Sequence, residues 1–451
     1  MTRFSRLIIC QKLMHCVRPF SVTVFSLLAF VFAVFEPGYA GDEEFTFELE
    51  EIEKKSLEWE GYTELRWEHM DIHQGSAFSL LNLADDPQPS FDKLLGALQL
   101  GGSYSQELYS LHWLFKAAAQ QDTLGWSDIA DIFNAYATFK PKASTSLSLG
   151  KKSYRWGKGY AWNPVGFINR RKDPNNPDEA LEGYITAEAD FIQSNIGIFQ
   201  TAALTTALLP VYDHVNDDFG VVDEMNLAAK LYLLLYDTDI DLVLRTGGSR
   251  STAYGLDFSR NLLANFEIHG ELAWTENQSH LILQPDGSFA GTEDDALAFL
   301  IGMRYLSSQN ITSIIEYYHN GGGYSQQEMD SFYQFAQDAG EDVLLASSSN
   351  LLEQARNASL KGYGRSQPGR NYFYARFNQK EPFDILYFTP AITTIINLED
   401  SSYSLTPELL YTGFTNWEIR VRFSLLSGGT FTEYGEKQNS NKLEVRLRYF
   451  F

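Results

Sequence analysis

The last ten residues of the chain alternate strictly between apolar and charged side chains. The apolar positions are Leu443, Val445, Leu447, Tyr449 and Phe451, and the positions between them hold Lys442, Glu444, Arg446 and Arg448. Successive side chains of a β-strand point to opposite faces. The segment therefore predicts a strand with one wholly apolar face and one wholly charged face. A strand that separates lipid from a wet interior has this pattern, and a soluble sheet edge could show it too.

The first forty residues have the layout of a secretory signal peptide. Four cations, Arg3, Arg6, Lys12 and Arg18, precede an apolar run over residues 20–35, and small residues end at Ala40. This layout predicts cleavage after Ala40. An N-terminal membrane anchor is the alternative, but the apolar run is shorter than the roughly 20 residues that a spanning helix needs.

Cleavage after Ala40 would leave 411 residues (451 minus 40). The peptide carries four cations and one acid, so the net charge would change from −23 to −26. Both cysteines, Cys10 and Cys16, would also be removed. We therefore expect an exported chain without disulfides or a thiolate metal site, and we expect no metal and no cofactor.

No later segment approaches 18 consecutive apolar residues, which excludes α-helical membrane spans. A terminal Phe preceded by apolar residues at every second position resembles the assembly signal of Gram-negative outer-membrane β-barrels. The resemblance implies a protein of the cell outer membrane, handled by the barrel assembly machinery and surrounded by lipid and lipopolysaccharide. We expect three parts: a signal peptide (1–40), an acidic periplasmic segment (41–56) and an outer-membrane β-barrel (57–451).

Segments of alternating polarity recur along the whole chain after residue 56, and membrane strands of about ten residues have this pattern. Such strands must close into a barrel, because hydrocarbon cannot satisfy an unpaired edge. We count eighteen segments, at 57–70, 92–104, 107–120, 130–140, 144–152, 182–193, 196–208, 223–236, 239–248, 251–260, 263–276, 295–306, 310–319, 370–379, 384–397, 402–412, 416–425 and 441–451. The prediction is an all-β, transmembrane, antiparallel up-and-down β-barrel of eighteen strands, or sixteen if two short segments are misread.

The connections between these segments alternate between short and long, as they do when both chain ends are periplasmic. Long outer connections are expected at 71–91, 153–181, 209–222, 277–294, 320–369 and 426–440. The connection 320–369 has helical apolar spacing over 326–337 and 350–359. Because structureless loops of this length are uncommon unless functional, we consider two interpretations: a lid or plug over the pore, and a surface helix pair.

The segment that opens the connection 153–181 combines glycines, aromatics and cations. It contains Arg155, Trp156, Lys158 and Trp162, and Arg170 and Arg171 follow it. Glycines allow close backbone approach, tryptophans supply rigid surface and clustered cations attract anions. One interpretation is a constriction loop folded into the barrel, and the other is a loop that caps the rim.

The run Trp-Gly-Lys-Gly-Tyr-Ala-Trp-Asn-Pro at 156–164 resembles a stretch found after a strand in outer-membrane porins and exporters. The nearest likeness is to an uncharacterised barrel family, which implies no activity. A more distant likeness, to the eighteen-stranded alginate exporters, covers only the strand number and the lumen arginines.

The last strands carry a basic lumen face. Strand parity predicts a pore-lining patch of Arg66, Arg376, Arg420, Arg422, Arg446 and Arg448. Lumen carboxylates are expected at Glu64, Glu188, Asp190, Asp241, Glu267, Glu271 and Glu316. Charges around a pore set its ion preference. The alternative is that the arginines form structural ladders with Glu418 and Glu444.

No enzyme motif is present, and His112 and His269 belong to no recognisable catalytic set. We therefore predict a channel, porin or exporter for small hydrophilic solutes, including anionic ones, with no enzymatic activity and no nucleic-acid partner. The alternatives are a plugged barrel that docks a partner and an outer-membrane enzyme that modifies lipid or polymer. The acidic clusters at 173–178 and 213–218 lack the register of a Ca²⁺ loop, and we interpret them as solvated loops.

Overall fold

The structure is a computed structural model that describes residues 56–84, 86–122, 125–177, 179–284, 287–344 and 350–451. The expected signal peptide and almost all of the acidic segment 41–56 lie outside the described residues.

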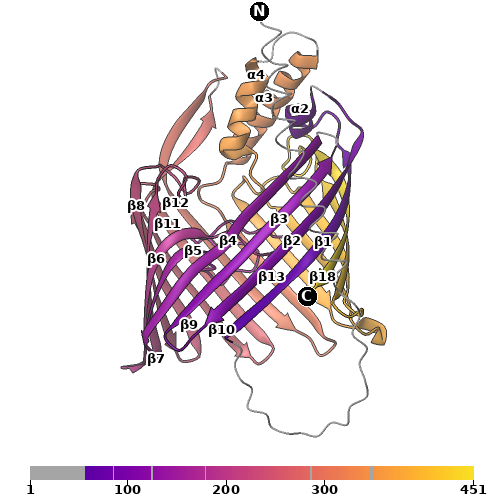
Figure 1. Cartoon of the computed structure of the whole chain (residues 1–451). Helices are drawn as coiled ribbons and strands as arrows, with labels where there is room; N and C mark the ends of the chain where they lie inside the picture. Colours follow the sequence, from indigo (N-terminus) through magenta and orange to yellow (C-terminus); the bar gives the residue numbers. More distant parts are fainter. Residues whose placement is uncertain (1–55, 85, 123–124, 178, 285–286, 345–349) are drawn as a thin grey trace, which may run out of the picture.

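Eighteen strands form one antiparallel sheet in which each strand pairs with its neighbours along the chain (Figure 1). The strands are β1 Leu57–Ile72, β2 Ser90–Ser105, β3 Tyr109–Asp122, β4 Gly125–Lys142, β5 Thr145–Lys152, β6 Tyr184–Ile196, β7 Phe199–Val211, β8 Glu224–Leu235, β9 Thr238–Gly247, β10 Ala253–Leu263, β11 Phe266–Leu283, β12 Phe289–Leu306, β13 Ile311–His319, β14 Asn371–Gln379, β15 Phe388–Asn397, β16 Tyr403–Tyr411, β17 Trp417–Ser427 and β18 Asn439–Phe450. The predicted eighteen-stranded antiparallel barrel is confirmed, and the alternative of sixteen strands is wrong.

The last strand closes the barrel against the first. β18 pairs with both β17 and β1, and Tyr62 lies opposite Phe450. Beyond the strand end, the backbones of Gly61 and Phe451 exchange two hydrogen bonds of 3.1 Å. Within the described residues, closure leaves no unpaired sheet edge, which is the condition for strands in hydrocarbon.

The two faces of the barrel wall differ in polarity. On β1, Leu65 is 50% exposed on the outer face, whereas its neighbour Glu64 is 7% exposed on the inner face. The apolar residues of β18 lie opposite apolar residues of β17 and β1, for example Leu447 opposite Ile419 and Leu65. The wall therefore presents an apolar belt outward and a polar lining inward. Among the described residues, no helix has the length and hydropathy needed to span a membrane.

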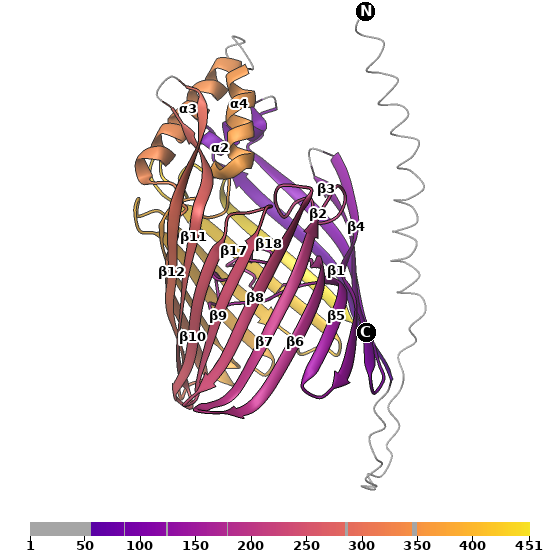
Figure 2. The same ribbon diagram turned by 90° about the vertical axis from the view of Figure 1, so that its left-hand side faces the viewer.

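One end of the barrel carries short connections and the other carries longer ones with helices. The expected outer connection 277–294 is mostly strand, because β11 and β12 continue as a hairpin that rises beyond the rim (Figure 2). Alternation in this region is weaker than in the wall, since a hairpin above the membrane has no lipid-facing side. The strand prediction was therefore too short here.

Three helices gather above the rim at the long-loop end (Figures 1 and 2). They are α2 Ala77–Leu83, α3 Gln326–Leu344 and α4 Asn350–Ala358, the last followed by a π-helical turn, Ser359–Tyr363. Phe78 of α2 packs on Phe332 and Tyr333 of α3, and Arg356 of α4 donates to the Leu81 carbonyl at 2.6 Å. The connection 320–370 thus carries a surface helix pair that packs on the first outer loop.

The connection between β17 and β18 joins this helix cluster through one carboxylate. Glu436 accepts hydrogen bonds from the Ala77 backbone N–H at 2.6 Å and from the Gln337 amide at 2.8 Å. It also accepts from the Phe431 backbone N–H at 2.8 Å. Three outer connections, far apart in sequence, are therefore bonded into one rim structure.

Candidate functional site

The connection between β5 and β6, residues 153–183, enters the barrel and is held by a carboxylate of β11, six strands from β5 around the wall. Glu271 of β11 accepts hydrogen bonds from the backbone N–H groups of Lys158, Gly159 and Val165 at 2.7, 2.6 and 3.1 Å. It also accepts from the Asn163 amide at 2.8 Å. Glu271 is 3% exposed. A buried carboxylate with four donors is a strong anchor, because charge-assisted bonds are about twice as strong as neutral ones.

Two glycines allow the backbone to turn tightly around the Glu271 carboxylate. Gly157 has a φ of +101°, a backbone conformation that favours glycine. A Cβ at Gly159 would collide with the Trp162 carbonyl oxygen. The Trp-Gly-Lys-Gly run therefore forms a tight turn whose N–H groups converge on Glu271.

A second carboxylate, Glu316 of β13, holds the next part of the turn. It accepts from the backbone N–H groups of Tyr160 and Ala161, the latter at 2.9 Å. The His269 ring lies 2.9 Å from the same carboxylate and 3.4 Å from Glu267. His269 is thus part of the structure that supports the loop, and no nucleophile accompanies it among these contacts.

Lys158 adds a side-chain contact to the same wall. Its ammonium lies 3.0 Å from Asp241 and 3.8 Å from Asp257. Asp241, Asp257 and Glu271 lie side by side on β9, β10 and β11. We call Asp241, Asp257, Glu271 and Glu316 the carboxylate wall.

The other residues predicted for the constriction loop lie at different places along it. Trp162 stacks on Tyr318 with ring centroids 5.1 Å apart, and Trp156 is buried against Tyr154. Arg170 pairs with Asp218 and Glu182 near the rim.

Arg155 and Arg171 are exposed, and Arg155 donates to the Glu179 carbonyl at 3.2 Å. Of the six residues, Lys158 and Trp162 contact the strands of the carboxylate wall. The three arginines do not meet there.

A basic wall spans β14, β16, β17, β18 and β1. We call it the arginine wall. It contains seven cations, Arg66, Arg376, Arg420, Arg422, Lys442, Arg446 and Arg448, and five carboxylates, Glu64, Glu68, Glu408, Glu418 and Glu444.

Every predicted pore-lining arginine is paired within this wall. Glu408 pairs with Arg376 at 3.0 Å, Arg422 at 2.6 Å and Arg420 at 3.7 Å. Arg446 pairs with Glu444 at 3.0 Å. The remaining two, Arg66 and Arg448, pair with Glu64 at 3.6 and 2.6 Å. The ladder considered as the alternative therefore exists, but it includes Glu408 and Glu64 besides Glu418 and Glu444.

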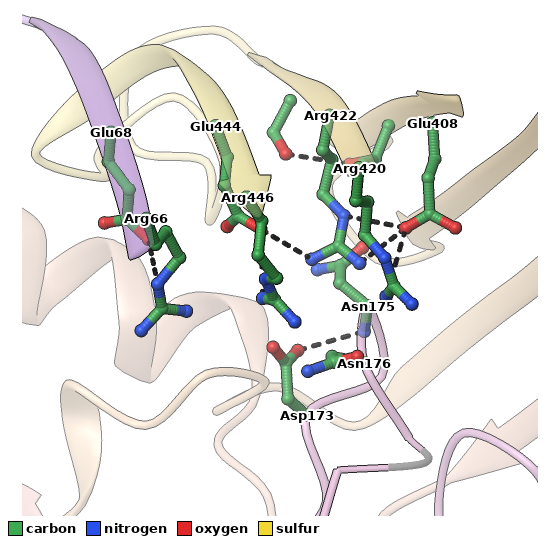
Figure 3. Close-up of polar contacts among 12 residues, drawn as sticks. Arg66, Glu68, Asp173, Asn175, Asn176, Glu408, Arg420, Arg422, Glu444 and Arg446 are labelled. Carbon is green, nitrogen blue, oxygen red and sulfur yellow. Dashed lines mark hydrogen bonds and ion pairs between the residues drawn. The ribbon is translucent and has the colours of Figure 1, made fainter. Parts of the chain in front are cut away.

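The tip of the connection 153–183 faces the arginine wall. Figure 3 shows the guanidinium groups of Arg446, Arg422 and Arg420 pointing toward the turn that contains Asp173 and Asn175. Among the described residues, the Asn175 amide oxygen and the Arg446 Nε and Nη1 atoms are buried without a hydrogen-bond partner. These polar atoms lie where the loop tip packs against the arginine wall.

Glu179, in the connection 153–183, is affected by the cations of the arginine wall and by Lys116 of β3. Its carboxylate lies 3.2 Å from the Lys116 ammonium. Partial burial opposes ionisation, but Lys116 and Arg446 outweigh it and lower the pKa of Glu179 below its usual range. Lys116 and the arginine wall together thus stabilise the ionised form of Glu179.

A cavity of about 460 Å³ lies beside the loop tip at the helix-bearing end of the arginine wall. Its lining includes three cations, Lys93, Arg422 and Lys442, and three acids, Glu68, Asp122 and Asp173. A cavity of this volume accommodates a small polar solute.

Three carboxylates of these walls were missed in the sequence, namely Glu68, Asp257 and Glu408. All three have the inward parity of their strands, and Glu408 follows Ser404 and Thr406 on the buried face of β16. Parity alone would have found Glu408. Of the carboxylates that were predicted, Glu188 pairs with Lys152, and Asp190 accepts from Ser146 at 3.3 Å.

His112 stacks on Tyr136, with ring centroids 4.9 Å apart. In the described part of the chain, no group of three or more His, Cys, Asp or Glu side chains is arranged to hold a metal ion.

No protein-family model and no curated protein matches the chain. Solved outer-membrane structures do. Acinetobacter baumannii OccAB1 gives a TM-score of 0.52 at 8% identity, over 88% of this chain and 97% of that one. Pseudomonas aeruginosa OccK2 (OpdF) gives 0.51 at 10% identity, over 88% and 97%. OccK2 in complex with glucuronate gives 0.50 at 10% identity, over 88% and 96%. At this identity the likeness concerns the fold.

Proposed function

We propose that this protein is an outer-membrane channel for small hydrophilic solutes that carry negative charge. The observation that carries the proposal is the arginine wall, whose guanidinium groups point toward the loop tip (Figure 3). An excess of cations along a solute path attracts anions.

The charge balance of the wall supports an anionic solute. Seven cations and five carboxylates leave a net charge of +2. The chain as a whole carries −23, so the positive wall is a local feature. Fixed charges that line a narrow path determine which ions pass. Glucuronate, bound in one of the similar solved structures, is an acidic sugar of the class we propose.

Reversal potential in planar bilayers tests this proposal. Replacing Arg420, Arg422, Arg446 and Arg448 with Gln leaves three cations and five carboxylates, so the net charge of the wall changes from +2 to −2. The channel should then prefer cations in a salt gradient. The shift should shrink at high salt, because the screening length falls from about 10 Å at 0.1 M to about 3 Å at 1 M.

The matched control is Arg260→Gln with Arg304→Gln, which removes two exposed cations that lie outside the arginine wall. It should leave the reversal potential unchanged. A folded quadruple variant with wild-type selectivity would contradict the anion path.

A plugged barrel that docks a partner is the second candidate. It is favoured by the anchoring of residues 158–165 on the carboxylate wall, since a loop held across the lumen narrows the path. Conductance separates the two candidates: discrete steps with wild-type protein support the channel, and their absence from verified folded protein supports the plugged barrel.

A further inference from the structure

The connection between β14 and β15, residues 380–387, differs from the other turns at its end of the barrel. It has eight residues, whereas the other seven connections at this end have two to five. It contains a short 3₁₀ turn, η2 Pro382–Asp384. Its sequence, Lys-Glu-Pro-Phe-Asp-Ile-Leu-Tyr, includes four large apolar or aromatic side chains.

These side chains point away from the protein. Phe383 is 92% exposed, Leu386 62%, Tyr387 56% and Ile385 48%. A short turn needs no apolar residues for its own stability, and contiguous exposed apolar patches mark interaction sites.

The backbone of the turn is held in an unfavourable conformation. Glu381, Phe383, Asp384 and Tyr387 all have φ between 52° and 62°. Neighbouring turns at this end use Asn310 and Asn416 at such positions, and asparagine tolerates them. A left-handed Phe is uncommon, and such outliers persist where the surroundings fix them.

Hydrogen bonds fix this conformation. The Glu381 N–H donates to the Phe388 carbonyl at 2.8 Å, and the Ile385 N–H donates to the Pro382 carbonyl at 3.2 Å. The Glu381 carboxylate accepts from the Tyr387 N–H at 2.9 Å. The turn is therefore a defined structure that keeps Phe383 and Leu386 outside the barrel.

The exposed side chains continue the apolar belt of the barrel. Phe377 of β14, Ile392 of β15 and Leu409 of β16 are exposed on the outer face of the wall beside the turn. On the adjacent turn, Phe414 is 58% exposed. The patch lies at the edge of the lipid-facing belt, which is the level of the lipid headgroups. Amphipathic segments with exposed aromatic and apolar side chains bind favourably at this level.

We propose that residues 380–387 form a membrane anchor that inserts Phe383 and Leu386 into the leaflet at the short-turn end of the barrel. The occupant is the phospholipid surface, because the patch is continuous with the belt that lipid already covers. Lys380, Glu381 and Asp384 supply the polar groups that remain at headgroup level. This anchor is independent of what passes through the lumen.

Site-directed labelling tests the anchor. With Cys10→Ser and Cys16→Ser, the chain has no other cysteine, so Phe383→Cys and Leu386→Cys can each carry one environment-sensitive fluorophore. The labelled chains are refolded into phosphatidylcholine vesicles, and folding is checked by faster gel migration before heating. Asp237→Cys, in the exposed turn between β8 and β9, is the matched control.

We expect blue-shifted emission at positions 383 and 386, with strong loss of fluorescence when the lipids carry a quencher near the headgroup. Aqueous iodide should quench the label at 237 much more. Iodide quenching at 383 equal to that at 237 would overturn the anchor. Protection from both quenchers would also overturn it, and would indicate a second copy or a protein partner on the patch.

Discussion

The loop that crosses the barrel meets two walls that hold charge in different ways. At the carboxylate wall, Glu271 and Glu316 accept hydrogen bonds of 2.6–3.1 Å from the loop backbone. At the arginine wall, the guanidinium groups pair with carboxylates of their own wall, and some donors remain unused. The first wall therefore positions the loop. The arginine wall keeps a net positive charge that faces the loop tip.

This contrast separates structural charge from charge that can act on a solute. A carboxylate that already accepts four hydrogen bonds has few free lone pairs with which to bind a cation. The arginine wall has a net charge of +2, so it keeps a positive field at the loop tip. Replacing single residues on each wall should therefore have different kinds of effect.

Glu271→Gln should have the largest effect. A neutral amide cannot accept four hydrogen bonds, and each buried donor left unsatisfied costs about 1–3 kcal/mol. We expect the docked loop to lose roughly 3 kcal/mol or more, which is over a hundredfold in its docked population. Single-channel recordings should show larger and noisier conductance.

Glu293→Gln is the control for this variant, since Glu293 is an exposed carboxylate of β12 that lies opposite Ser279, eight residues beyond Glu271 on β11. Unchanged conductance and noise in Glu271→Gln would mean that the carboxylate wall does not hold the loop.

Opposite single changes on the arginine wall should give opposite, smaller effects. Glu408→Gln raises the net charge of the wall from +2 to +3, and Arg446→Gln lowers it to +1. The first should increase anion preference and the second should reduce it, measured as reversal potential at 0.1 M salt. If the ladder is only structural, both variants should lower the temperature of heat-induced unfolding while selectivity stays the same.

The smallest effect concerns pH at the loop tip. The pKa of Glu179 is lowered by Lys116 and Arg446 against the opposing effect of burial. A carboxyl with a depressed folded pKa stabilises the docked tip above its unfolded pKa of about 4.3, and this stabilisation is lost as pH falls through the folded value.

Channel noise should therefore be constant from pH 8 to about pH 5 and increase only in stronger acid. Glu179→Gln should remove that increase. An onset near neutral pH would point to a different titrating group.

The barrel was predictable because its signal is repeated in every strand. Lipid on one side of the wall and a polar lining on the other require apolar and polar residues to alternate along each strand, as at Leu65 and Glu64. Closure of the barrel requires every strand to be present and, with both chain ends on one side, an even number of strands. The boundaries of β11 and β12 were less predictable, because their upper halves stand above the rim without a lipid-facing side.

The course of the loop was not predictable from its own residues. Its glycines and tryptophans allowed either a rim cap or an inward fold. The decision depends on Glu271 and Glu316, which lie more than a hundred residues away and bond to backbone N–H groups that any sequence has. The ion pairs of the arginine wall were also only partly predictable, because their partners lie on different strands. The register between β16 and β17 places Glu408 opposite Arg422.

The bonding of three outer connections through Glu436 has a consequence for recognition from outside the cell. The surface formed by α2, α3 and the segment before β18 is discontinuous in sequence. Antibodies raised against folded protein should include many that fail on denatured protein and on single-loop peptides. A peptide tag inserted into one of these loops should therefore disturb the other two.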